Sequence, residues 1–144
     1  MARFIAAFCL FLGIALGAGF RAVAQPVSEA DARAARSVVS AQLEAFAKDD
    51  AKRAFSYAAP SIRAMFGTPE RFLAMVRTGY PVVYRPAGVT FLIALHADAD
   101  LVQRVHLTDG AGALWLATYR LERQPDGTWR IAGCGVQPAT GTVI

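Results

Sequence analysis

The chain has 144 residues, 55% of them hydrophobic, and a net charge of +4. This length suits one domain with a modest core. Its 15 basic residues are scattered along the sequence, so the basic stripe expected of a nucleic-acid-binding protein is missing.

The N-terminal segment has the pattern of a secretory signal peptide. Arg3 is a short basic region, residues 4–20 form an apolar run, and Ala22-Val23-Ala24 supplies small residues before a cleavage site. The alternative is a retained membrane anchor, but the run is shorter than the ~20 residues that a spanning helix needs. We therefore expect cleavage after Ala24, export to the periplasm or the medium, and membrane contact only during export.

Cleavage would leave Cys134 as a single free thiol. A single cysteine forms no internal disulfide, so the core must hold the fold together. Such a cysteine is usually a small buried hydrophobe, and the alternatives are an intermolecular bridge or a reactive thiol. The sequence divides into a signal peptide (1–24), one domain (25–137) and a C-terminal tail (138–144).

Helical patterns fill the first half of this domain. Ser28 predicts an N-cap, with Asp31 returning the capping hydrogen bond, and an apolar stripe then recurs at helical spacing as far as Phe46. Helix-starting and helix-ending residues predict three shorter helices, which cover residues 51–59, 61–66 and 69–79.

The segment 80–86 contains two prolines and is predicted to be extended, because a proline disfavours helix in the residue before it. Beyond it the apolar period changes from helical spacing to two, which indicates strands. The predicted strands cover residues 89–95, 101–107, 114–123 and 129–134. Between the last two, Pro125-Asp126-Gly127 predicts a tight turn.

Helices followed by consecutive antiparallel strands predict an α+β fold, in which N-terminal helices pack on a curved sheet of four main strands. This order resembles the NTF2-like fold, also called cystatin-like, in which sheet and helices enclose a cone. That fold serves many purposes, so it implies no function by itself.

A narrower resemblance rests on segments 54–63, 66–67, 72–76, 80–86 and 124–134. Together they resemble the pattern of a bacterial family known as a domain of unknown function, DUF4864. The resemblance covers nearly the whole mature chain. It implies a small exported protein, and it supplies no established activity or catalytic residue to transfer.

No combination of residues predicts catalysis. The carboxylates are predicted at helix starts or in turns, and Glu122 alternates away from Tyr119, so no acid faces a predicted pocket. His96 and His106 have no convergent carboxylate or cysteine. We therefore expect no catalytic residue, no metal site and no cofactor.

Aromatic and cationic side chains remain as candidates at the mouth of a cone. Tyrosine and tryptophan combine an apolar body with a polar tip, and Arg63 or Arg85 could balance an anionic ligand. The alternative is that the large aromatic side chains are core and that Arg85 pairs with a carboxylate or a helix end. The candidate ligand-binding residues are Tyr57, Arg63, Tyr80, Tyr84, Arg85, His106, Trp115 and Tyr119.

These observations favour a non-catalytic module that binds a small ligand or another protein, with a second copy of the chain as a partner through the sheet. One alternative is a cone-pocket enzyme, of isomerase or hydratase type, that uses a histidine or tyrosine as acid/base. A cavity in which His106, Tyr84 or Tyr57 converge would favour it. Another is an envelope structural or assembly factor, which predicts an exposed apolar patch on the outer sheet face.

The export prediction has a direct test. The intact mass of the protein purified from the cells that make it should correspond to a chain that begins at Gln25. A mass that includes the apolar run would contradict cleavage and favour the retained anchor.

Overall fold

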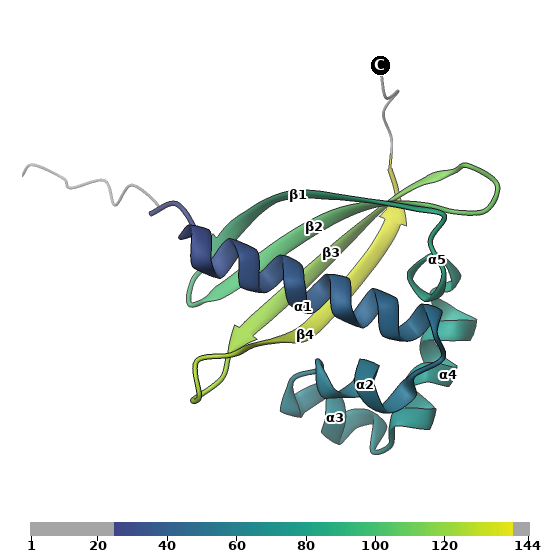
Figure 1. Cartoon of the computed structure of the whole chain (residues 1–144), viewed down its shortest axis with the longest axis horizontal. Coiled ribbons are helices and arrows are strands. Elements are labelled where there is room, and N and C mark those ends of the chain that lie inside the picture. The colour runs from purple at the N-terminus through teal and green to yellow at the C-terminus, as the bar shows by residue number, and fades with distance from the viewer. Residues whose placement is uncertain (1–24, 140–144) are drawn as a thin grey trace, which may run out of the picture.

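The computed structural model describes residues 25–139, so the predicted signal peptide and most of the predicted tail lie outside the described residues. Within this range five helices precede four strands (Figure 1). The helices are α1 (Glu29–Ala47), α2 (Ala51–Ser56), α3 (Pro60–Phe66), α4 (Pro69–Gly79) and α5 (Pro81–Tyr84). The strands are β1 (Gly88–Ala97), β2 (Asp100–Thr108), β3 (Leu114–Arg123) and β4 (Trp129–Pro138).

Helix α1 begins at its predicted cap, where Ser28 Oγ accepts a hydrogen bond from the Asp31 backbone N–H at 3.1 Å. The sequence predicted that the Asp31 side chain would return this hydrogen bond, but it does not. Its carboxylate instead accepts from Trp129 Nε1 at 3.1 Å and from Arg123 at 2.8 Å. The carboxylate thereby ties the start of α1 to the β3–β4 hairpin.

The shorter helices lie close to their predicted positions. Helix α2 ends at Ser56, earlier than predicted, and Pro60 is the first residue of α3 rather than the end of the preceding helix. Helix α4 has the predicted bounds, with Thr68 as its cap.

The predicted extended conformation over 80–86 is wrong, because α5 forms one helical turn inside it. Proline restricts the residue before it, and the two residues in that position, Tyr80 and Arg85, are indeed non-helical. Pro81 itself is favourable at the first position of a helix, and the residues after it are free to continue the turn.

The strands form an antiparallel sheet in the order β1-β2-β3-β4, which confirms the predicted meander and the α+β fold. Alternate residues of β2 are buried, and α1 lies across the face into which they point (Figure 1). We call this the inner face. In the β3–β4 turn Gly127 has the positive φ of 86° that its glycine predicted, and Asp126 accepts a hydrogen bond from the Thr128 N–H.

Strand β1 departs from the predicted alternation. Its pairing with β2 shifts between Phe91 and Ala94, so Ala94 is buried while Ile93 is 75% exposed. The buried Gln103 side chain stabilises this irregularity, because its Nε2 donates to the Leu92 carbonyl at 2.7 Å and to the Arg104 carbonyl at 2.9 Å. At the other edge, β4 includes Pro138, which the sequence assigned to the tail.

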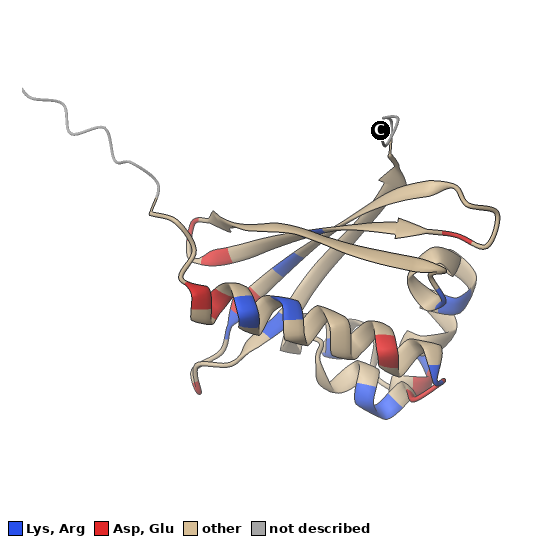
Figure 2. Cartoon of the chain, turned by 45° about the horizontal axis from the view of Figure 1, so that its top comes forward, with Lys and Arg blue, Asp and Glu red and all other residues tan. Residues whose placement is uncertain are grey.

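An aromatic cluster joins the helices. The Phe72 ring on α4 lies 5.5–5.6 Å, between ring centroids, from Phe46 of α1, Phe55 of α2 and Phe66 of α3. Such tilted aromatic pairs stabilise a fold beyond the area that they bury. Charged residues are spread over the helices, the turns and strands β2 to β4 (Figure 2).

An ionic cluster fastens the turn after α1 to α4 and α5. The Asp49 carboxylate accepts a hydrogen bond from the Tyr84 hydroxyl and forms salt bridges with Arg77 at 3.2 Å and Arg85 at 3.0 Å. The hydrogen bond from Tyr84, followed by the contacts with the two arginines, lowers the pKa of Asp49 below its ordinary value of 3.8. The folded state therefore favours the ionised carboxylate.

This cluster predicts a pH-dependent contribution to stability. Because the folded-state pKa of Asp49 is depressed, the contribution is present above the unfolded pKa of 3.8 and is lost as the pH falls through the folded value. D49N should lower the melting temperature near neutral pH, and the gap to wild type should narrow in acid. Asparagine tolerates the positive φ of 54° at this position, so the backbone is not strained. A gap that stays constant from neutral pH to about pH 2.5 would contradict this role.

Candidate functional site

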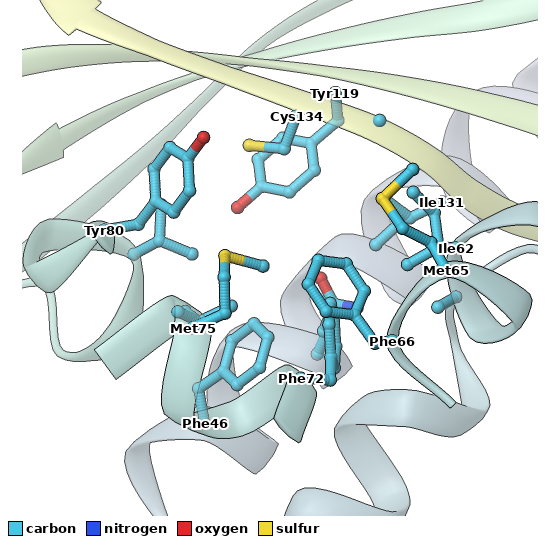
Figure 3. A pocket seen from close by; sticks show the side chains of 15 residues that line it. Phe46, Ile62, Met65, Phe66, Phe72, Met75, Tyr80, Tyr119, Ile131 and Cys134 are labelled. Carbon is cyan, nitrogen blue, oxygen red and sulfur yellow. The ribbon is translucent and has the colours of Figure 1, made fainter. Parts of the chain in front are cut away.

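A cavity of about 270 Å³ lies between the helices and the inner face of the sheet. We call it the Tyr119 cavity. Phenylalanines from α1, α3 and α4 line one side, and Tyr80, Tyr119 and Cys134 line the opposite side (Figure 3). Its lining residues are Gln42, Phe46, Ala58, Ile62, Met65, Phe66, Phe72, Met75, Val76, Tyr80, Val83, Tyr119, Ile131, Gly133 and Cys134, none of which is charged.

The hydroxyl of Tyr119 is the unusual group in this cavity. Tyr119 is 1% exposed, and its hydroxyl makes no hydrogen bond of acceptable geometry among the described residues; the Cys134 thiol beside it is a weak polar contact. It points into the cavity, as does the nearby thiol of Cys134, to which Tyr119 is paired across β3 and β4 (Figure 3). Burial raises the pKa of Tyr119 well above its ordinary value, so this hydroxyl stays protonated and can donate as well as accept.

The cavity is open to solvent on one side. Met65 and Tyr80, which both line it, are 72% and 36% exposed. Phe46 and Tyr119, in contrast, are almost completely buried. A molecule that entered past Met65 and Tyr80 would therefore leave water before it reached the Tyr119 hydroxyl.

The structure brings two of the sequence-predicted candidates together, since Tyr80 and Tyr119 both line this cavity. The other candidates do not line it. Tyr84 and Arg85 belong to the Asp49 cluster, so the alternative in which Arg85 pairs with a carboxylate is the one observed. Trp115 lines a second cavity, described below.

Three further candidates are held elsewhere. The Tyr57 hydroxyl accepts a hydrogen bond from Arg53 at 3.3 Å, and the Arg63 guanidinium lies over the Phe55 ring. His106 is on the outer face of β2, paired with Thr90 and Leu116 of the neighbouring strands. The convergence of His106, Tyr84 and Tyr57 that would favour an enzyme is therefore not observed in the Tyr119 cavity.

Sequence reasoning missed most of the cavity wall. Phe66, Met75 and Cys134 come from three different elements, and each fits the pattern of an ordinary core residue. Nothing in a single segment separates an apolar residue that faces a cavity from one that faces its neighbours. The one available signal was the tyrosine in the middle of a buried strand face, because a buried hydroxyl needs a partner.

Two further features bear on the chemistry of the chain. Within residues 25–139, no three His, Cys, Asp or Glu side chains are grouped as a metal site would need. In the same range, no helix combines the length and apolar character needed to cross a membrane.

The Cys134 thiol should be unreactive in the native protein. Burial raises its pKa to about 12 from an ordinary 9.0, and the contact with Tyr119 offsets this only in part. Because the thiolate is the nucleophile, its alkylation by iodoacetamide near pH 8 should be slower than in the unfolded chain by roughly a thousandfold. The labelled peptide can be quantified by mass spectrometry. Equal rates in the native and the guanidinium-unfolded protein would contradict the raised pKa of this half-buried thiol.

Comparisons with known proteins add the family. A search of curated proteins and a search of solved structures found no match to this chain. The family model described as "Domain of unknown function (DUF4864)" matches residues 28–144, which include every helix and strand of the described structure. The chain therefore belongs to the DUF4864 family.

Proposed function

We propose that this protein is an exported, non-catalytic binding protein whose Tyr119 cavity holds a small and mostly apolar ligand with one neutral hydrogen-bonding group. The observation that carries the proposal is the buried Tyr119 hydroxyl, which faces an apolar cavity and has no partner among the described residues. The pattern of the first 24 residues supports export. The helices packed over an antiparallel sheet, with a cavity between them, support an NTF2-like fold.

The unpaired hydroxyl is costly to the free protein. A buried polar group without a partner costs about 1–3 kcal/mol, and phenylalanine would fill the same space without that cost. A ligand carbonyl or hydroxyl in the cavity would give Tyr119 the missing hydrogen bond. The ligand would thus recover part of a cost that the free protein bears.

The lining restricts the size and charge of the ligand. The volume of about 270 Å³ is near the lower end of ligand sites. An apolar cavity of about 150 Å³ accommodates benzene, so one ring with a short substituent fits this larger space. No charged side chain lines the cavity, so the part of the ligand inside it is uncharged.

The enzyme alternative receives less support. His106, Tyr84 and Tyr57 lie outside the Tyr119 cavity, and burial keeps the Cys134 thiol protonated. Proton transfer needs a group whose pKa lies near the working pH, and neither Tyr119 nor Cys134 meets that condition.

A second candidate role is that of an interaction module, including a dimer of two copies. Strand β1 is an edge strand, and it exposes the large apolar side chains of Val89, Ile93 and Leu95. Exposed apolar edge strands favour pairing with another chain. A concentration-dependent mass in solution that is lost in a variant with lysine at position 93 would support this role.

The ligand-binding proposal predicts opposite effects for Y119F on stability and on binding. Removal of the unpaired hydroxyl should stabilise the free protein by about 1 kcal/mol, which denaturant unfolding would detect. The same variant should bind N-ethyl phenylacetamide about tenfold more weakly by calorimetry, because the amide carbonyl loses its donor. Reduced stability of free Y119F would show that the hydroxyl already has a partner, and would contradict the proposal.

A variant that fills the cavity provides the matched test of location. Met75 lines the cavity and is half-buried, so M75W should abolish the binding of N-ethyl phenylacetamide. The control is I93W, which adds the same ring at an exposed position of β1. Undiminished binding in M75W would place the ligand elsewhere.

A further inference from the structure

A second cavity, of about 360 Å³, lies next to the first. We call it the Trp115 cavity, because Trp115 lines it together with Asp109 and Val136. Tyr80 lines both cavities, so it forms a wall that they share. The prediction that no acid faces a pocket is therefore wrong for Asp109.

The two cavities lie on the same, inner face of the sheet. On β4, Cys134 lines the first cavity and Val136 lines the second. On β3, Tyr119 lines the first and Trp115 the second. Side chains an even number of residues apart on a strand share a face, so a molecule that occupied both cavities would have to pass Tyr80.

The Trp115 cavity differs from the first in carrying a fixed negative charge. The Asp109 carboxylate accepts hydrogen bonds from Trp115 Nε1 at 3.0 Å and from the backbone N–H groups of Ala111 and Ala113, each at 2.9 Å. These bonds, that of Trp115 above all, lower the pKa of Asp109. Asp109 forms no salt bridge with any basic residue in the described part of the chain. No basic residue lines the cavity.

Two aromatic residues complete this site. Trp115 and Tyr80 both line the cavity that holds the Asp109 carboxylate. A carboxylate beside aromatic rings is the arrangement that attracts ammonium groups, because the ring faces carry negative potential and tryptophan is the most effective ring. The same arrangement repels a carboxylate on the ligand.

We propose that the natural ligand is an amine with an apolar body, whose ammonium group occupies the Trp115 cavity between Trp115, Tyr80 and Asp109 while its body occupies the Tyr119 cavity. This inference rests on the proposed function, because it extends the ligand of the Tyr119 cavity past Tyr80. It assigns the charge of the ligand, which the uncharged first cavity alone does not determine.

Three probes that share the phenylacetamide part and differ only in their terminal group test the charge preference of the Trp115 cavity. N-aminoethyl, N-hydroxyethyl and N-carboxymethyl phenylacetamide share the ring and the amide, and they end in an ammonium, a hydroxyl and a carboxylate. Calorimetry at low salt should give the ammonium probe about tenfold higher affinity than the hydroxyl probe, and the carboxylate probe the lowest. D109N should remove the preference for the ammonium probe and keep the binding of the hydroxyl probe.

A charge-reversal variant makes the test independent of the hydrogen bonds that Asp109 accepts. Gly79 ends α4 and lines the Trp115 cavity, and a Cβ at this position would meet open space. Lysine suits the last turn of a helix, so G79K should fold. It should reverse the order of the three probes, while S40K, which adds the same charge on the exposed side of α1, should keep the wild-type order.

The outcomes separate the two proposals. Equal affinity for the three probes in wild type, or an order that G79K leaves unchanged, would overturn the ammonium site and leave the proposed function standing. Failure of all three probes and of N-ethyl phenylacetamide to bind would overturn both. Tighter binding of the ammonium probe to wild type and D109N alike would also overturn the assignment to Asp109.

Discussion

Two backbone hydrogen bonds at the edge of β4 determine where the short helices lie. The Ile131 N–H donates to the Tyr57 carbonyl at 2.8 Å, and the Ala59 N–H donates to the Ile131 carbonyl at 2.7 Å. They join the α2–α3 connection to the sheet through a parallel bridge between Ala58 and Ile131. Helix α3 therefore starts at the edge of the sheet, and its side chains form one wall of the Tyr119 cavity.

The short helices beside the cavity are held by contacts with one another, with α1 and with the edge of β4. The Phe72 cluster joins α4 to the three preceding helices, and Asp49 fastens α5 and the end of α4 to the turn after α1. These contacts and the β4 bridge leave the space beside Tyr119 without a side chain to fill it. A fold selected for stability alone would gain by closing that space, since unfilled volume forfeits packing contacts.

Local signals in the sequence predicted the fold well. Ser28 and Thr68 begin helices, Gly127 turns the last hairpin, and the change of apolar period marks the sheet. The failures have physical causes outside the segments concerned. Helix α5 forms because proline restricts only its predecessor, and the β1 irregularity depends on Gln103 of the neighbouring strand.

The candidate site was predictable only in part, because a cavity depends on the packing of distant segments. Of the side chains that residue type suggested, Tyr80, Trp115 and Tyr119 line a cavity. Residue type suggested Arg85 equally, but in the structure Arg85 forms a salt bridge with Asp49. A turn aspartate such as Asp109 looks like a loop residue in the sequence, and only the tertiary structure places it in a cavity wall.

A crystal structure of the protein soaked with N-ethyl phenylacetamide would show directly whether the Tyr119 cavity binds a ligand. Binding in this cavity predicts electron density for the phenyl ring between Phe46, Phe72 and Met75, with the amide carbonyl within hydrogen-bond distance of Tyr119 Oη. Ordered water that links this hydroxyl to the protein, in a cavity that excludes the probe, would contradict a ligand-binding role for Tyr119. Tyr119 would then be a hydrated core residue rather than the anchor of a ligand.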